Sequence, residues 1–354
     1  MQKRGPIDNR KIMLVALLIM VAAAMCFTAL KRERGKALAV ESQPEAQKVV
    51  IWYTSLAEDA ARKLANAFEL EYKNTIRVEV VRSSSAEITQ RLLDEIQNQN
   101  ETADVFHVAD VGIFLKLKEE GCLLEYHSVQ YAFYPQGYKD EGFWAAMRVN
   151  AIGMSYDSNR ITDPPGSWTD LMDSRWKGRI ALKNVLTSGT AYGEYYILRE
   201  LYGVEFWEKI TNQEPTIYKK YSQIADALLS GEVDIAMEFA AYKAYEYSLK
   251  KGTSIRWINP SDGVPMVPAP LAILKNAPHP EEARLLFDFL LSEKGQNLTQ
   301  RLVGTYSVRP GVEILAGKTP SGDLIQLLPE SWEQYEERKE ALRAEFRELF
   351  KFEE

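Results

Sequence analysis

Short apolar runs alternate with amphipathic segments along most of the chain. Residues 49–53 (VVIWY) are almost continuously apolar, which is typical of a strand buried on both faces. Apolar residues then recur at helical spacing as far as about Lys73, and further strands are predicted at 76–81 and 103–108. This alternation predicts βαβ units, and therefore an α/β fold whose mainly parallel sheet has helices on both faces.

A second block with the same alternation follows a long apolar strand predicted at 149–156. Its predicted elements are a helix at 169–173, a strand at 180–182, a long helix through 202, a helix at 224–229 and a strand at 233–239. Pro265, Pro268 and Pro270 suit an edge strand or an interdomain crossing better than a central strand. The tail 331–352 is predicted to be one amphipathic helix packed on the body, with a coiled-coil arm as the alternative.

Residues 1–39 have the features of an export signal, because four basic residues precede the uncharged run 12–30. Three interpretations remain open: cleavage after the small-x-small motif 37–39, lipidation at Cys26, and an uncleaved membrane anchor. In each case the body works in the periplasm or at the outer face of the cytoplasmic membrane. Residues 40–48 are polar and are predicted to be a tether.

Length and charge narrow the class of protein. The 354 residues favour two domains, and 46% apolar with 26% charged residues is a globular composition. The formal net charge is −7, and eight basic and two acidic residues fall within 1–39, so the remainder carries −13. A body this acidic predicts no nucleic-acid partner, because phosphate neutralisation needs a basic surface.

Cysteine and histidine usage offers little catalytic chemistry. Two cysteines exclude a disulfide scaffold, and three histidines lack the spacing of a metal site. The sequence contains no GxSxG elbow, no Walker loop and no GxGxxG after a strand. We therefore expect no enzyme activity, no cofactor and no catalytic metal.

Five segments, in this order and spacing, carry a family resemblance. They are IWYTS at 51–55, ADVF at 103–106, SGEVDIA at 230–236, PAPLAILK at 268–275 and FDFLLSEKGQ at 287–296. Together they resemble the bacterial extracellular solute-binding proteins of the ferric-iron and organophosphonate (2-aminoethylphosphonate-like) type. The resemblance covers about residues 49–352.

The resemblance implies a type II periplasmic binding fold, with two lobes, a central cleft and two crossing strands. We expect 49–150 and 268–354 to form lobe 1 and 151–267 to form lobe 2. Such a protein is a monomer whose lobes close around a small-molecule ligand, and its closed form is presented to the membrane permease of an ABC importer.

Iron-binding members of the family hold the metal through a His in the first loop, a Glu after the third strand and a Tyr-Tyr pair. These positions fall here on Ala57, on Ala109, and on Ala241 with Tyr242. Fe(III) prefers several hard oxygen donors, so one tyrosine among alanines predicts no metal site. Tyr242 would be a metal ligand only if the iron interpretation held.

Hydroxyl side chains are predicted at three helix N-termini facing the expected cleft. They are Thr54 and Ser55, then Ser83, Ser84 and Ser85, and finally Ser188 and Thr190 on either side of Gly189. Helix N-termini attract anions, and parallel strands end at one crevice, so these residues predict an anion site. The alternative is that each hydroxyl only caps its own helix.

Further candidates to line the cleft are Asp110, Trp144, Glu238 and Tyr242, and Glu238 could hold a ligand ammonium group. The sequence thus predicts a substrate-binding protein that captures a small organic anion, a phosphonate or phosphate ester with or without an amine, by hinge closure. The alternatives are a ferric-iron-binding protein of the same fold and a membrane-anchored ligand sensor for a signalling receptor.

Overall fold

The computed structural model describes residues 47–351, so the predictions for 1–39 and for most of the tether lie outside the described residues. Within 47–351, no helix combines the length and the apolar composition that a membrane span requires.

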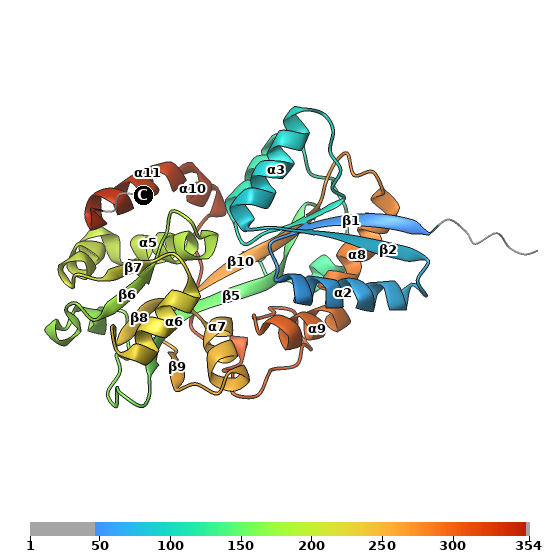
Figure 1. The fold of residues 1–354 in the computed structure, drawn as a ribbon. Coiled ribbons are helices and arrows are strands. Elements are labelled where there is room, and N and C mark those ends of the chain that lie inside the picture. Colours follow the sequence, from blue (N-terminus) through green and yellow to red (C-terminus); the bar gives the residue numbers. More distant parts are fainter. Residues whose placement is uncertain (1–46, 352–354) are drawn as a thin grey trace, which may run out of the picture. The chain divides into compact units, whose positions relative to one another are not determined.

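The strands join into one sheet in the order β2-β1-β3-β10-β5-β8-β6-β7, with β4, β9 and β11 attached at its sides (Figure 1). The strands are β1 (Lys48–Thr54), β2 (Ile76–Arg82), β3 (Val105–His107), β4 (Lys139–Asp140), β5 (Trp144–Asp157), β6 (Ile180–Lys183), β7 (Thr216–Tyr218), β8 (Ile235–Ala240), β9 (Ile255–Ile258), β10 (Val264–Ile273) and β11 (Gln326–Leu327). The α-helices are α2 (Glu58–Glu71), α3 (Ser85–Gln97), α4 (Val111–Glu119), α5 (Gly189–Asn212), α6 (Tyr221–Ser230), α7 (Ala241–Tyr245), α8 (Pro280–Leu291), α9 (Glu293–Val303), α10 (Trp332–Glu337) and α11 (Lys339–Phe350).

Two long antiparallel strands connect the halves of the sheet. β1 pairs in parallel with β2 and β3, and β6 pairs in parallel with β7 and β8. β5 runs antiparallel to β10, and its first residues also pair with β4 while its last pair with β8 and β9. The C-terminal residues of β10 pair antiparallel with β3. The α/β prediction is confirmed, as is the pair of crossing strands, which Figure 1 shows between β1 and β8.

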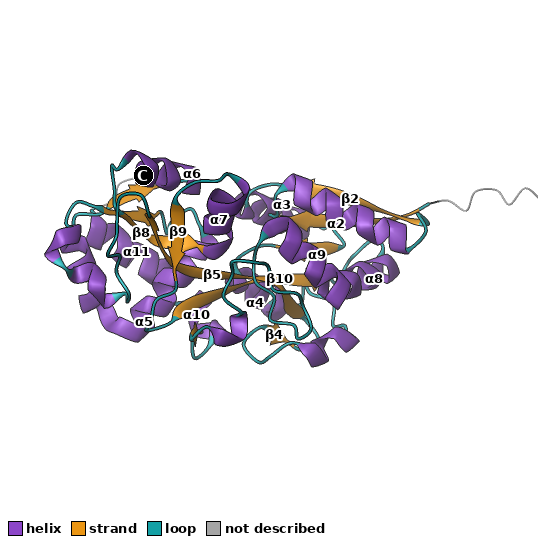
Figure 2. Ribbon diagram, turned by 90° about the horizontal axis from the view of Figure 1, so that it is seen from below, coloured by secondary structure: helices purple, strands orange, loops and turns teal. Residues whose placement is uncertain are grey.

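Alternation along the strands explains the helical layers. Trp52 packs with α2 and α8, whereas its neighbour Tyr53 packs with α3 and α4, because successive side chains of a strand point to opposite faces. Both rings are completely buried. Helices therefore lie on both sides of the strands, as Figure 2 shows.

The proline-rich strand β10 is a crossing strand, as one of the two expectations had it. From Met266 to Ala269 it pairs only with β5, and β3 joins it from Leu271 onward. Its register shifts between Ala269 and Pro270, where a proline without an N–H interrupts the ladder least.

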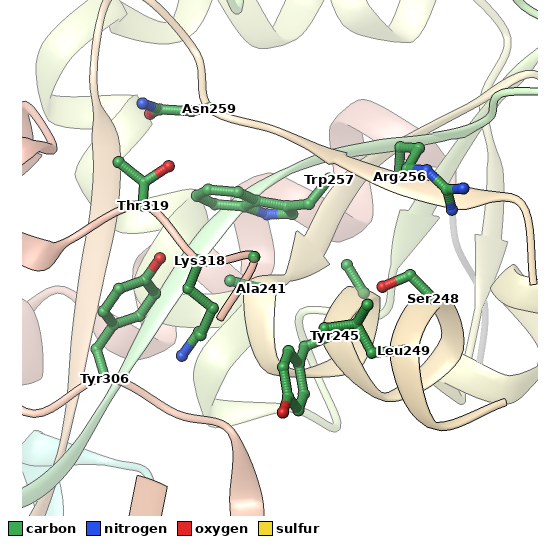
Figure 3. Close-up of a pocket in the computed structure, with 12 residues that line it drawn as sticks. Ala241, Tyr245, Ser248, Leu249, Arg256, Trp257, Asn259, Tyr306, Lys318 and Thr319 are labelled. Carbon is green, nitrogen blue, oxygen red and sulfur yellow. The ribbon is translucent and has the colours of Figure 1, made fainter. Parts of the chain in front are cut away.

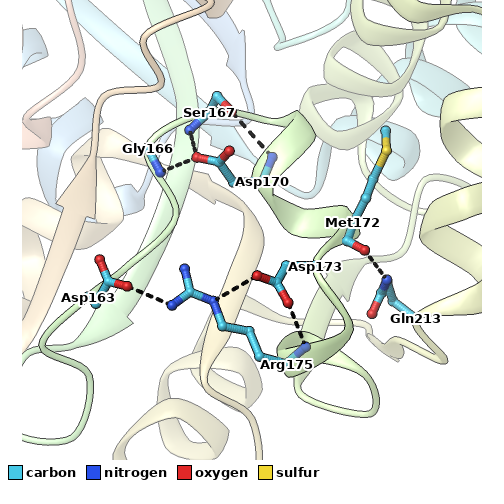
Figure 4. A network of polar contacts seen from close by, with 8 residues as sticks. All are labelled: Asp163, Gly166, Ser167, Asp170, Met172, Asp173, Arg175 and Gln213. Atoms are coloured by element: carbon cyan, nitrogen blue, oxygen red, sulfur yellow. Dashed lines mark hydrogen bonds and ion pairs between the residues drawn. The ribbon is translucent and has the colours of Figure 1, made fainter.

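Two predicted helices differ in the structure. The helix expected at 169–173 is a short 3-10 turn, Thr169–Met172, which ends where the backbone becomes extended at Asp173, with ψ of 130°. At its start, the Asp170 carboxylate accepts hydrogen bonds from the backbone N–H groups of Gly166 and Ser167 (Figure 4). These bonds, that of Gly166 first, lower the pKa of Asp170. The long helix α5 continues to Asn212 through a break at Gly203, whose φ of 75° favours glycine.

The C-terminal tail forms two helices, α10 and α11, that meet at Arg338. Phe346 of α11 packs edge-on against Tyr195 of α5 with ring centroids 5.5 Å apart, and Glu345 pairs with Arg199 at 2.8 Å. The lobe boundaries stay a prediction. Residues 268–354 were all expected in lobe 1. However, the tail helix α11 packs on α5, an element of the expected lobe 2, because its aromatic residues join the hydrophobic core around α5.

Candidate functional site

The serines before α3 are engaged in helix capping. Ser84 is the N-cap and forms a capping box with Glu87: its hydroxyl accepts from the Glu87 N–H, and the Glu87 carboxylate accepts from the Ser84 N–H. The Glu87 carboxylate accepts bonds from the hydroxyls of Ser83 and Ser84, and these bonds lower its pKa. A carboxylate thus lies where an anion was expected, and Ser85 is the first residue of the helix. These contacts match the capping alternative.

The ends of β1 and β3 are joined by a buried hydrogen bond. Thr54 Oγ1 lies 2.8 Å from Nδ1 of His107, and both side chains are fully buried. The Ser55 N–H donates to the His107 carbonyl at 3.1 Å, while the Ser55 hydroxyl and His107 Nε2 are buried without a partner. Burial lowers the pKa of His107 well below its usual value, so this imidazole is neutral.

The start of α5 approaches the loop after β3 closely. Ser188 caps α5 by accepting from the Ala191 N–H at 3.2 Å, and Thr190 lies partly buried in the first turn. A Cβ on Gly189 would lie 2.4 Å from the carbonyl oxygen of Ala109, so only glycine permits this approach.

Two other predicted site residues have structural partners. Asp110 caps α4 and pairs with Lys339 of α11 at 2.8 Å. Trp144 is almost fully buried and belongs to the hydrophobic core. Neither contact points to a ligand.

Six buried polar side chains form what we call the central cluster: His107, Arg148, Asn150, Lys183, Glu194 and Glu238. None of them is more than 7% exposed. They come from β3, from the crossing strand β5, from β6, from α5 and from β8, and thus from both halves of the sheet.

Strand register and helix packing place these residues. Arg148 and Asn150 are two residues apart on β5 and so share one face. The parallel register of β6 and β8 carries Lys183 alongside Glu238. A Cβ on Gly193 would lie 2.8 Å from the Val267 side chain, so α5 lies directly on β10. The next residue of α5, Glu194, is close enough to Glu238 of β8 for that carboxylate to raise its pKa.

Arg148 forms the basic end of the cluster. Its guanidinium donates to Asn150 Oδ1 at 2.8 Å, while its Nε and Asn150 Nδ2 are buried without a partner. Arg148 makes no ion pair with any residue in 47–351. Burial lowers its pKa, and the groups that oppose this effect are the phenols of Tyr242 and Tyr221. A buried guanidinium without a carboxylate is costly, so this end of the cluster favours an anion.

Two carboxylates form the acidic end. Glu238 Oε1 accepts from the Tyr221 hydroxyl at 2.8 Å, but its Oε2 is buried and unpaired. Glu194 Oε1 is also buried without a partner. Burial raises the pKa of both carboxyl groups, the charge of Glu238 raises that of Glu194 further, and Lys183 partly offsets the rise at Glu238. This end accepts a proton or a cationic group.

Tyr221 and Tyr242 link the two ends. Their rings meet edge-on with centroids 6.4 Å apart, and the Tyr221 hydroxyl donates to Glu238. Both phenols also raise the pKa of Arg148, against the effect of burial. The cluster therefore offers positive and negative recognition at separate points. Within 47–351, no group of three or more His, Cys, Asp and Glu side chains is placed to hold a metal ion.

The sequence prediction included Glu238 and Tyr242 but missed Arg148, Asn150 and Glu194. The available signal was a pair of polar residues two positions apart within the apolar segment 144–157, and one glutamate within a helix of buried tyrosines. Lys183 supplies a further positive charge to the cluster, whereas Arg82, at the end of β2, is exposed.

Comparisons with known proteins decide the family. Residues 100–313 match the family model described as bacterial extracellular solute-binding protein. The chain belongs to this family. The thiamine-binding periplasmic protein of Salmonella typhimurium is 25% identical over 166 residues, which are 46% of this chain and 50% of that protein, so the chain spans about half the length of that relative.

Solved structures of solute-binding proteins share the fold. Iron-bound HitA from Pseudomonas aeruginosa superposes with a TM-score of 0.74 at 23% identity, covering 85% of this chain and 99% of that chain. AfuA from Actinobacillus pleuropneumoniae, with fructose 6-phosphate bound, gives a TM-score of 0.74 at 20% identity over 87% of this chain and 100% of that chain. The fold is therefore that of the type II periplasmic binding proteins, as predicted.

Proposed function

We propose that this protein is the substrate-binding component of an ABC importer, and that its ligand is a small organic anion that also carries an amine or another hydrogen-bond donor. Ligand binding closes the hinge formed by β5 and β10, and the closed form is presented to a membrane permease. The observation that carries the proposal is the central cluster, where Arg148, Glu194 and Glu238 are buried with unpaired polar atoms.

The anionic part of the ligand is assigned to Arg148 and Asn150. Together they offer a guanidinium and an amide whose Nε and Nδ2 have no partner. A phosphonate, phosphate ester or carboxylate accepts from such donors through charge-assisted hydrogen bonds. This assignment replaces the hydroxyls before α3, where Glu87 holds the helix N-terminus.

The donor part of the ligand is assigned to Glu194 and Glu238. Both carboxylates present a buried oxygen without a partner, so an ammonium group placed there gains strong hydrogen bonds and relieves the repulsion between two like charges. The expected ligand is an aminophosphonate or an amino-bearing phosphate ester. The relatives' names include ligands as different as thiamine, iron and fructose 6-phosphate, so ligand class must be tested directly.

The experiment is a thermal-shift and calorimetric screen of the purified full chain. The probes are 2-aminoethylphosphonate, inorganic phosphate, fructose 6-phosphate, thiamine and ferric citrate. A ligand that binds only the folded protein raises the unfolding midpoint. We expect 2-aminoethylphosphonate to bind more tightly than phosphate. Arg148→Met should abolish binding of both, whereas Glu238→Gln should weaken only the amine-bearing ligand.

Three results contradict the proposed ligand class. Binding of thiamine alone, unaffected by Arg148→Met, would mean that the carboxylates select a cation. Equal binding of phosphate and 2-aminoethylphosphonate would remove the amine from the proposal. Iron binding with a tyrosinate-to-iron absorption band, lost in Tyr242→Phe, would establish the ferric-iron alternative.

A further inference from the structure

A cavity lined by none of the residues of the central cluster lies between α7, β9 and the segment that follows α9. Its volume is about 360 Å³, enough for a small ring compound, and Figure 3 shows its lining. Tyr245 and Ser248 face it from one side of α7 and the turn that continues it. Tyr242, which packs on Tyr221 of the proposed ligand site, is not among the lining residues, so the two sites are separate.

The lining is basic. Lys318 and Arg256 contribute positive charge, and none of the lining residues is acidic. The Lys318 ammonium donates to the carbonyl oxygens of Gly304 and Thr305 and lies 3.9 Å from the centroid of the Tyr306 ring. It makes no ion pair within 47–351, and burial lowers its pKa to about 7. An anion in the cavity would supply the missing negative charge.

Aromatic rings form the walls around this ammonium. Figure 3 shows the Lys318 side chain passing below the Trp257 indole and ending between the rings of Tyr306 and Tyr245. The indole is held in place because its Nε1–H donates to the Phe239 carbonyl at 3.1 Å. Flat aromatic walls bind a planar ring by stacking and apolar contact.

We propose that this cavity is a second binding site that takes a small aromatic anion, with its carboxylate or phosphate on Lys318 and its ring against Trp257. The site goes beyond the proposed function, since it does not involve the central cluster. A bound ring would connect Tyr306 and Lys318 in the segment after α9 to α7 and β9.

The test uses calorimetric titration of the full chain with indole-3-acetate and with phenyl phosphate. Uncharged 3-methylindole serves as the control for ring contact alone. We expect both anions to bind more tightly than 3-methylindole. Lys318→Met keeps the length of the side chain and should lower the affinity for the anions roughly 10-fold or more. Lys275→Met, at an exposed position outside the cavity, is the matched control and should change nothing.

A second variant protects the test against misfolding. Ser248→Phe leaves Lys318 in place but fills the cavity from the α7 side, and it should abolish binding while the thermal midpoint stays near that of the wild type. The proposal is overturned if neither anion binds the wild type at millimolar concentration. It is also overturned if both variants bind the anions as the wild type does, or if Arg148→Met abolishes anion binding while Ser248→Phe does not. That last result would assign the anions to the central cluster.

Discussion

Replacing the basic end of the central cluster should stabilise the empty protein while strongly weakening ligand binding. The perturbation is the double variant Arg148→Met with Asn150→Leu. Both side chains are buried, their one mutual hydrogen bond is 2.8 Å long, and Arg148 has no carboxylate partner in 47–351. Removing both partners together avoids leaving a buried acceptor unsatisfied.

The expected gain follows from the cost of burying a charge. Buried ion pairs replaced by apolar residues of similar volume often leave a protein about 1–4 kcal/mol more stable, and Arg148 lacks even the compensating carboxylate. We therefore expect the free energy of unfolding to rise by about 1–3 kcal/mol. Binding of the proposed anion should weaken by about 2–5 kcal/mol, which is roughly 30-fold to 4,000-fold in Kd.

The assay is urea unfolding followed by tryptophan fluorescence, with ligand affinity measured by calorimetry. An unchanged urea dependence (m) would show that the midpoint reports stability rather than a different unfolded state. The matched control is Arg179→Met. Arg179 is bonded twice to Asp234 and also to the Gly231 carbonyl, so its loss should destabilise the fold by about 1–3 kcal/mol and leave ligand affinity unchanged.

The outcome that refutes this reasoning is a double variant less stable than the wild type by more than about 1 kcal/mol, with the same m and with ligand affinity retained. Arg148 would then be a structural residue whose charge is compensated within the fold. The proposed anion site would have to lie elsewhere.

Three further predictions test other parts of the site. Ser84→Ala should cost about 1 kcal/mol of stability through loss of the capping box but leave ligand affinity unchanged; a weakened affinity in calorimetry would restore this serine as a ligand residue. Gly189→Ala should destabilise by about 1–3 kcal/mol in urea unfolding, since its Cβ would lie 2.4 Å from the Ala109 carbonyl oxygen; an unchanged midpoint would contradict that approach. Burial raises the pKa of Glu194, and that of Glu238 to about 8, so above the ordinary value of 4.5 the folded state holds more protons than the unfolded state. The free energy of unfolding should therefore fall as pH rises from 4.5 to about 8. Glu194→Gln should reduce this dependence of stability on pH, and an unchanged dependence would contradict the assignment.

Much of the fold follows from local patterns. The apolar run before Thr54 is a strand because successive residues pack on opposite helical layers. Ser84 with Glu87 starts a helix because each side chain satisfies the other residue's backbone N–H. Where the local sequence pattern was ambiguous, packing against other helices decided where each helix begins and ends. The tail was expected as one helix, and it divides at Arg338 into a part that packs on α4 and a part that packs on α5.

The sequence by itself determined the α/β class, the crossing strands and the family, because these depend on periodicity and on short segments in a given order. It also supplied Glu238 at the end of a strand. Only the tertiary structure decided which polar residues meet. Arg148, Glu194 and Glu238 lie on β5, α5 and β8. Glu238 raises the pKa of Glu194, and Tyr221 and Tyr242 lie between this acidic pair and Arg148. Burial then removes the water that would otherwise solvate these charges, so residues that are unremarkable in the sequence become the chemically distinctive ones in the fold.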